Sequence, residues 1–263
     1  MDYSPSWTKE QIKDHKESAE RLGKIKDEVI QLLENNKKIY EGDVLSYIQK
    51  AYKKHGLKND SKKEFAIVAF GKNTNQVHYF PKGKGKKVKN DSLILIDLWA
   101  RLDKKNAPYA DMTWMLWYRP NIDSINKYVP VWNSVARARD NAIKLIKRCA
   151  KAKKLPRGLD IDRIAHDEIG SKGFGEGIKH TVGHSLGFDS PHGKAKGINW
   201  KEYSLIIQNL GYTIEPGIYL KEFGFRTEID FYVDQNYNVI VTTPVEQTLN
   251  IVLDFDKING KNK

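Results

Sequence analysis

The chain has 263 residues, 40% of them apolar and 11% aromatic, which excludes a disordered protein and allows a sizeable core. A single cysteine, Cys149, excludes an intrachain disulfide. No apolar run approaches the roughly 20 residues that span a bilayer, so a membrane partner is not expected. The first residues, MDYSPSWTKEQ, lack the layout of a signal peptide, and we expect a cytoplasmic protein.

The net charge of +12 raises the question of nucleic-acid binding. The lysines are spread along the chain and often lie beside acidic residues. The densest cluster, PKGKGKKVK at 81–89, contains no aromatic residue on which a base would stack. We therefore expect a solvated basic loop and no specific nucleic-acid partner.

The first half of the chain predicts two helices followed by three strands. TKEQ at 8–11 resembles a capping box, and apolar residues at helical spacing continue from there to Leu33. A second helix is expected over 41–55. Short apolar runs then predict strands at 64–71, 91–100 and 109–119.

The second half repeats this order. Helical periodicity returns over 123–153 and 159–170, and strands are expected at 211–220, 225–233 and 238–244. Two related halves of this kind predict an α+β fold with one mixed sheet and helices on one side. We expect a single domain over residues 1–263.

Four carboxylates lie within or beside these strands, and a histidine occupies a Gly-His-x-x-Gly turn. They are Asp97, Asp111, Glu215, Glu228 and, in the turn, His184. A lone strand carboxylate usually faces solvent or a salt bridge, but four buried together are costly unless cations neutralise them. Such a hard, oxygen-rich set suits Mn, Co, Fe or Zn, and carboxylates can bridge two metals.

These motifs resemble those of the pita-bread metallopeptidases: methionine aminopeptidase, aminopeptidase P, prolidase and creatinase. The five ligands of that family occur here in order, in LIDLWA (Asp97), YADMT (Asp111), VGHSLG (His184), IEPGIY (Glu215) and RTEID (Glu228). The resemblance covers nearly the whole chain. It implies two pseudo-symmetric halves with a curved mixed sheet and helices on its outer side.

Further residues resemble the aminopeptidase P and prolidase branch. They are His78 in NQVHYFP, His180 four positions before His184, His192 downstream, and Arg226 two positions before Glu228. This branch implies hydrolysis of short peptides at an Xaa-Pro bond by a hydroxide that bridges two divalent ions, with Mn(II) favoured over Co, Zn or Fe. Glu215 would act as general base, and the three histidines and Arg226 would contact or orient the substrate.

The resemblance leaves alternatives open, because the chain departs from the family in places. The Asp97–Asp111 hairpin is longer than usual, and Trp114 stands where many relatives have Arg; Trp114 and Trp117 either wall the pocket or pack in the core. The family's N-terminal domain is expected to be absent, and a homodimer is compatible with the resemblance. A methionine aminopeptidase-like enzyme and an inactive binding module remain the alternative functions. His15 and His55 lie in polar helical sequence and are expected to be exposed.

Overall fold

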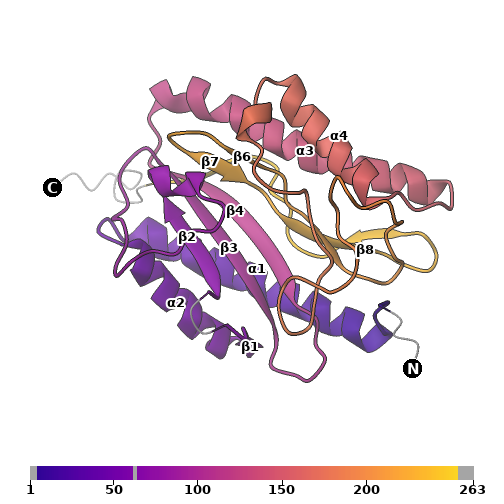
Figure 1. Ribbon diagram of the computed structural model, residues 1–263. Helices are drawn as coiled ribbons and strands as arrows, with labels where there is room; N and C mark the ends of the chain where they lie inside the picture. The colour runs from indigo at the N-terminus through magenta and orange to yellow at the C-terminus, as the bar shows by residue number, and fades with distance from the viewer. Residues whose placement is uncertain (1–4, 62–63, 254–263) are drawn as a thin grey trace.

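The computed structural model describes residues 5–61 and 64–253 (Figure 1). The first half contains α1 (Lys9–Asn35), α2 (Glu41–Lys54), β1 (Leu57–Lys58), β2 (Ala66–Phe70), η1 (Gly71–Asn75), β3 (Ser92–Leu102) and β4 (Ala110–Tyr118). The second half contains η2 (Ile122–Ser124), α3 (Ile125–Lys151), α4 (Gly158–Ser171), η3 (Gly175–Gly177), β5 (Tyr212–Ile214), β6 (Gly217–Tyr219), β7 (Gly224–Arg226), β8 (Ile229–Val233), β9 (Val239–Val241) and β10 (Asn250–Val252). The predicted helix-then-strand order of both halves is confirmed.

The predicted start of the first helix is confirmed in detail. The Gln11 N–H donates to Thr8 Oγ1 at 3.2 Å, and the Thr8 N–H donates to Gln11 Oε1 at 2.8 Å. This reciprocal pair satisfies two backbone donors that the first turn of a helix leaves free. The cap therefore fixes where α1 begins.

The sequence predicts one mixed sheet, whereas the described strands form one five-stranded sheet and two smaller ones. In the larger sheet β1 and β2 both pair antiparallel with β3, which pairs antiparallel with β4. β10 then joins β4 in parallel, so this sheet is mixed. The second half supplies the β5–β8–β9 sheet and the β6–β7 pair.

The two helix pairs enclose the strands, with α1 and α2 on one side and α3 and α4 on the other (Figure 1). Alternate residues of β4 serve two cores. Trp114 and Leu116 pack with α1 and α2, whereas Met115 and Trp117 pack with α3 and α4. No helix in residues 5–61 and 64–253 is both long and apolar enough to cross a bilayer.

Two predicted strands are interrupted, and each interruption falls at a predicted metal ligand. Residues 211–220 form β5 and β6 with Glu215 and Pro216 between them, and 225–233 form β7 and β8 with Glu228 between them. Pro216 has no N–H for a ladder. The Glu228 N–H instead donates to the Thr113 carbonyl of β4 at 3.2 Å, which joins the second half of the fold to the first.

Candidate metal centre

The register of the β3–β4 hairpin places two predicted ligands on one face. Asp97 pairs with Thr113, and Trp99 pairs with Asp111. Because side chains alternate along a strand, these four residues point to the same side of the sheet. The longer hairpin between Asp97 and Asp111 therefore keeps the two carboxylates together.

The other three predicted ligands lie beside the short strands of the second half. His184 lies beside a bridge between Ser185 and Tyr212, at the start of β5, and Glu215 follows β5 directly. Glu228 follows β7, and its Oε2 accepts a hydrogen bond from Thr113 Oγ1 at 2.8 Å. Short strands thus present these side chains to the face that carries Asp97 and Asp111.

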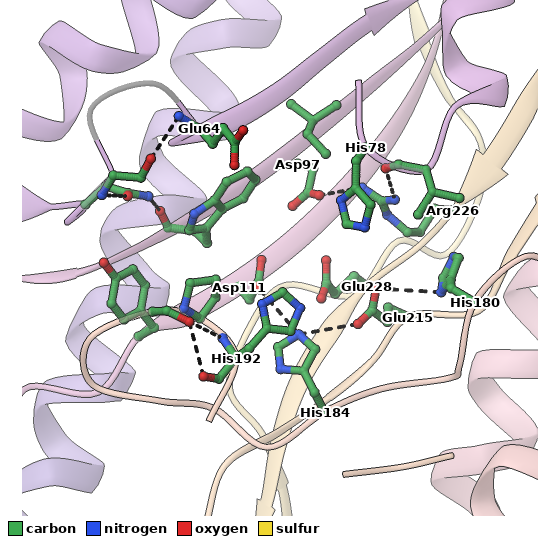
Figure 2. Close-up of a pocket in the computed structure, with 18 of the residues that line it drawn as sticks. Glu64, His78, Asp97, Asp111, His180, His184, His192, Glu215, Arg226 and Glu228 are labelled. Atoms are coloured by element: carbon green, nitrogen blue, oxygen red, sulfur yellow. Dashed lines mark hydrogen bonds and ion pairs between the residues drawn. The ribbon is translucent and has the colours of Figure 1, made fainter. Parts of the chain in front are cut away.

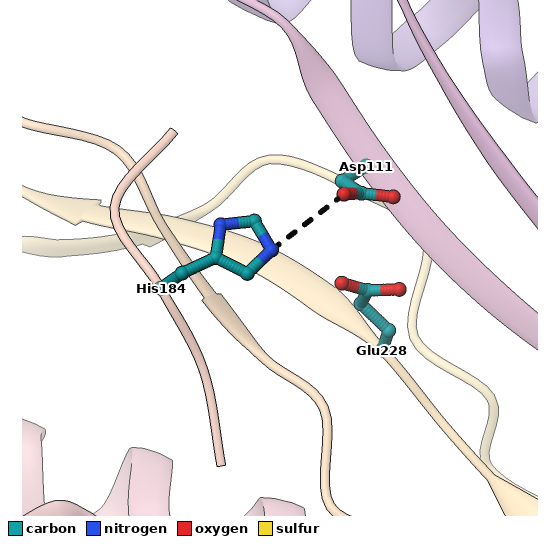
Figure 3. Close-up of side chains that lie close together, drawn as sticks. All are labelled: Asp111, His184 and Glu228. Atoms are coloured by element: carbon teal, nitrogen blue, oxygen red, sulfur yellow. Dashed lines mark ion pairs between the residues drawn. The ribbon is translucent and has the colours of Figure 1, made fainter. Parts of the chain in front are cut away.

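Three of the predicted ligands meet closely. One ligand atom from each of Asp111, His184 and Glu228 lies within 4.8 Å of the other two (Figure 3). His184 Nε2 lies 3.8 Å from Asp111 Oδ2 and 3.4 Å from Glu215 Oε1. One imidazole nitrogen and several carboxylate oxygens therefore converge on a common point.

The ring of His184 is oriented as a ligand requires. Its Nδ1–H donates to the Ser185 carbonyl at 3.0 Å, which leaves the Nε2 lone pair directed at the carboxylates. Burial lowers the pKa of His184 to about 3, helped by the neighbouring His192. A neutral imidazole is the form that binds a metal ion.

Asp97 differs from the other acids because a buried cation compensates its charge. Arg226 Nη2 donates to Asp97 Oδ2, and Arg226 also donates to Thr113 Oγ1 at 3.1 Å and to the Tyr219 hydroxyl at 3.0 Å. Burial raises the pKa of Asp97, and Arg226 opposes that rise. One edge of the centre is therefore a closed hydrogen-bonded network.

The remaining acids lack such compensation. Burial, with the neighbouring carboxylates, raises the pKa values of Asp111 and Glu228 well above their usual range, and burial raises that of Glu215 to about 7. Among the described residues, Asp97 Oδ1 and Asp111 Oδ1 are buried without a hydrogen-bond partner. Hard carboxylate oxygens with free lone pairs and one imidazole are a donor set that fits divalent cations.

The predicted substrate-binding residues line a cavity of about 590 Å³ together with these ligands (Figure 2). His78, His180, His192 and Arg226 all border it. His180 Nδ1–H donates to the Thr181 carbonyl and Nε2 accepts from the Tyr219 hydroxyl, both at 2.8 Å. The His192 ring lies 4.2 Å from that of His184, centre to centre. The structure thus brings every predicted site residue to one cavity.

Several residues of the site escaped the sequence analysis. Thr113 and Trp99 lie two positions from the two aspartates, so strand alternation was a usable signal for both. Asp230 follows Glu228 by two positions, is fully buried, and accepts the Asp111 N–H at 2.8 Å. Tyr219, which links His180 to Arg226, carried no signal in the sequence.

The structure also answers the question about the tryptophans. Trp114 and Trp117 are buried in the two cores and do not border the cavity. Trp114 alternates with Asp111 and Thr113 along β4, so it points to the opposite face. There Lys26 lies 3.9 Å from the centre of its ring system.

The expectation that His15 and His55 are exposed is wrong. His15 is fully buried: Nδ1–H donates to the Tyr109 carbonyl at 2.9 Å, and Nε2 accepts from the Thr242 hydroxyl at 2.7 Å. His55 is half-buried, with Nε2 3.0 Å from Glu28 Oε1. Both belong to polar helix stretches that pack against other elements.

The basic loop at 81–89 is confirmed, since all five of its lysines are exposed.

Comparison with known proteins agrees with this geometry. Residues 13–235 match the sequence model of metallopeptidase family M24, and the chain belongs to that family. An uncharacterized peptidase of Staphylococcus epidermidis is 30% identical over 206 residues, which cover 78% of this chain and 53% of the relative. The chain therefore spans about half the length of this curated relative.

Solved structures show the same fold. An X-Pro aminopeptidase from Thermotoga maritima superimposes with a TM-score of 0.79 at 24% identity, covering 94% of this chain and 64% of that one. A prolidase from Thermococcus sibiricus gives 0.79 at 25% identity, covering 94% and 62%. The predicted α+β, pita-bread fold is confirmed.

Proposed function

We propose that this metallopeptidase is an exopeptidase that hydrolyses the Xaa-Pro bond at the N-terminus of short peptides. The observation that carries the proposal is the convergence of five ligand-type side chains and three further histidines on one cavity. The names of the structural neighbours, an X-Pro aminopeptidase and a prolidase, support the proline preference.

Two divalent ions, for which we propose Mn(II), would be held by Asp97, Asp111, His184, Glu215 and Glu228. Bound there, such ions supply an activated water and polarise the scissile carbonyl. The carboxylates contribute the negative charge that such ions require. Their orientation is fixed by hydrogen bonds from Thr113 to Glu228 and from Thr213 to Glu215.

Glu215 is the residue proposed to move the proton. Burial raises its pKa to about 7 in the metal-free protein, and bound cations would favour the ionised carboxylate, which is the form that accepts a proton. It would take the proton of the attacking water and pass it to the leaving amine of proline. Thr213 Oγ1, 3.3 Å from Glu215 Oε1, holds one carboxylate oxygen in place during this exchange.

The histidines have different tasks in this proposal. His180 uses both ring nitrogens to hold Thr181 and Tyr219, so it orients the Tyr219–Arg226 pair. His192 is proposed to donate a hydrogen bond to the carbonyl oxygen as negative charge develops there. His78 is proposed to contact the leaving side of the peptide.

The test is hydrolysis by metal-stripped protein reloaded with Mn(II), Co(II) or Zn(II). Substrates are Ala-Pro, Ala-Pro-Ala and Met-Ala-Ser, and the variant Glu215→Gln is expected to lose about 10²- to 10⁴-fold in rate on the proline substrates. The matched control is Glu222→Gln, an exposed acid paired with Lys72, which is expected to keep full activity.

Two results would overturn the proposal. Cleavage of Met-Ala-Ser alone would assign the chain to methionine aminopeptidase-like activity. Failure to cleave any of the three peptides while metal is bound would favour an inactive binding module.

A further inference from the structure

The orientation of His78 depends on its two neighbours in the chain. Among the described residues, no hydrogen bond or ion pair holds its imidazole. On one side, the Val77 carbonyl accepts a hydrogen bond from Arg226 Nη1 at 3.1 Å. On the other side, the Tyr79 hydroxyl donates to Glu41 Oε2 at 2.8 Å. His78 is thus held between two buried anchors of opposite charge.

Glu41, the first residue of α2, is completely buried and accepts four hydrogen bonds. Oε1 accepts from the Phe70 N–H at 2.7 Å and from Asn73 Nδ2 at 2.8 Å. Oε2 accepts from the Tyr79 hydroxyl and from the Lys86 N–H at 2.6 Å. A carboxylate has about four lone-pair sites, so this one is saturated.

These four donors belong to the end of β2, to η1, to the segment with His78 and to the basic loop. One carboxylate therefore holds four points of the 70–86 segment against the start of α2. Gly85 packs directly against this carboxylate, because a Cβ atom at position 85 would lie only 2.3 Å from Glu41 Oε2. Asn73 adds a cross-link, because its Nδ2 also lies 2.6 Å from the Tyr79 hydroxyl.

We infer that Glu41 is a positioning residue that fixes His78 at the cavity through the Tyr79 hydroxyl. The inference rests on the proposed function, since it assigns to Glu41 control over how the leaving side of the peptide is held. Glu41 itself borders neither the cavity nor the metal ligands, so it acts only through the segment that it anchors.

The kinetic test is a double-mutant cycle on Ala-Pro-Ala with Mn(II). Tyr79→Phe removes the hydroxyl and its two hydrogen bonds, to Glu41 and from Asn73, and Glu41→Gln replaces an acceptor oxygen by an NH₂ group. Both are expected to lower kcat/KM about 10- to 100-fold, the effect of a misplaced substrate contact. In a His78→Ala background the same changes are expected to have less than about a 2-fold effect, because the positioned group is absent.

The control is Glu28→Gln. Glu28 likewise accepts from a tyrosine hydroxyl, that of Tyr47 at 2.9 Å, and from Lys54 and His55, but on the α1–α2 surface away from the cavity. It is expected to leave kcat/KM unchanged. Full additivity of Glu41→Gln and His78→Ala would overturn the inference.

A second measurement does not depend on activity. In proton NMR spectra of the metal-free protein, the His78 ring signal is assigned by its loss in His78→Ala. It is expected to shift and broaden in Tyr79→Phe and Glu41→Gln but not in Glu28→Gln, and an unchanged signal in the first two would overturn the inference. If the wild-type protein cleaves no Xaa-Pro peptide, the proposed function fails, and this signal alone decides the role of Glu41.

Discussion

The buried carboxylates at the two edges of the candidate metal centre differ in how their negative charge is compensated. At one edge Asp97 is paired with the buried guanidinium of Arg226, which is itself bonded to Thr113, Tyr219 and the Val77 carbonyl. At the other edge Asp111 and Glu228 lie beside each other, the neutral His184 and further acids, and neither forms an ion pair with a lysine or arginine among the described residues. The first edge contains a compensating cation within the protein, whereas the second has none in direct contact, and we propose that divalent cations fill that role.

This difference shows where binding energy for metal would come from. Removing carboxylates from water without a partner costs several kcal/mol per ion, and that cost is recovered when a divalent cation neutralises them. We therefore propose that the Asp111–Glu228 edge favours metal binding at the expense of the stability of the metal-free protein. The Asp97–Arg226 ion pair is already formed without metal.

The largest expected effect comes from breaking the complete edge. Arg226→Met leaves Asp97 buried without its partner, and we expect the metal-free protein to lose about 3–5 kcal/mol of unfolding free energy. Urea denaturation in the presence of a chelator measures this. The control is Arg101→Met, whose pairing with Asp60 is closer to the surface and should cost about 0–1 kcal/mol. Equal losses for the two variants would contradict the comparison.

A smaller effect of opposite sign is expected at the incomplete edge. The folded-state pKa of Asp111 is raised well above its unfolded value, so at neutral pH placing this carboxyl group in the buried site costs stability. Asp111→Asn removes that charge and should stabilise the metal-free protein by about 0.5–2 kcal/mol. Asp97→Asn should instead destabilise it, because Arg226 loses its partner. Shifts of the same sign in both variants would refute the distinction between the edges.

The smallest effect concerns His15, which lies behind the incomplete edge with Nε2 3.9 Å from Asp230 Oδ2. Burial lowers the pKa of His15 from 6.5 to about 4, so the neutral ring provides no cation for Asp230. Between pH 6.5 and 4 the unfolded chain binds a proton there that the folded chain does not. This group therefore costs stability as pH falls through that window and contributes nothing of this kind at pH 7.

The check is His15→Asn, whose amide can still donate to the Tyr109 carbonyl. Its unfolding free energy, followed from pH 7 to pH 4 in the metal-free state, should fall less steeply than that of the wild-type protein. Parallel curves would mean that His15 does not carry the dependence.

The proposed metal ligands are accessible from the sequence because several of them carry a local signal. Asp97 ends an apolar run, His184 lies in a glycine-bounded turn, and Glu215 precedes a proline. The surrounding network was less accessible. Thr113 and Asp230 follow from strand alternation once the ligands are placed, but Tyr219 and Glu41 act through partners far away in the sequence, and only the fold brings those together.

The interruptions of the two strands also could not be predicted from the sequence pattern. Periodicity over 211–220 and 225–233 predicts continuous strands, since apolar residues recur at alternate positions along each run. The structure breaks them because Pro216 lacks an N–H and because Glu228 bonds across to Thr113. The expected exposure of His15 is wrong for a similar reason. Its polar neighbours on α1 indicate an exposed side chain, but this part of the helix lies against Tyr109.

The most direct test of this account is to count the metal ions bound by the protein. Isothermal titration of the metal-stripped chain with Mn(II), with metal content measured after dialysis, is predicted to give about two ions per wild-type chain. Asp111→Asn is predicted to lose this binding although it folds more stably. A wild-type chain that takes up no metal at neutral pH would contradict the claim that the incomplete edge is built for cations.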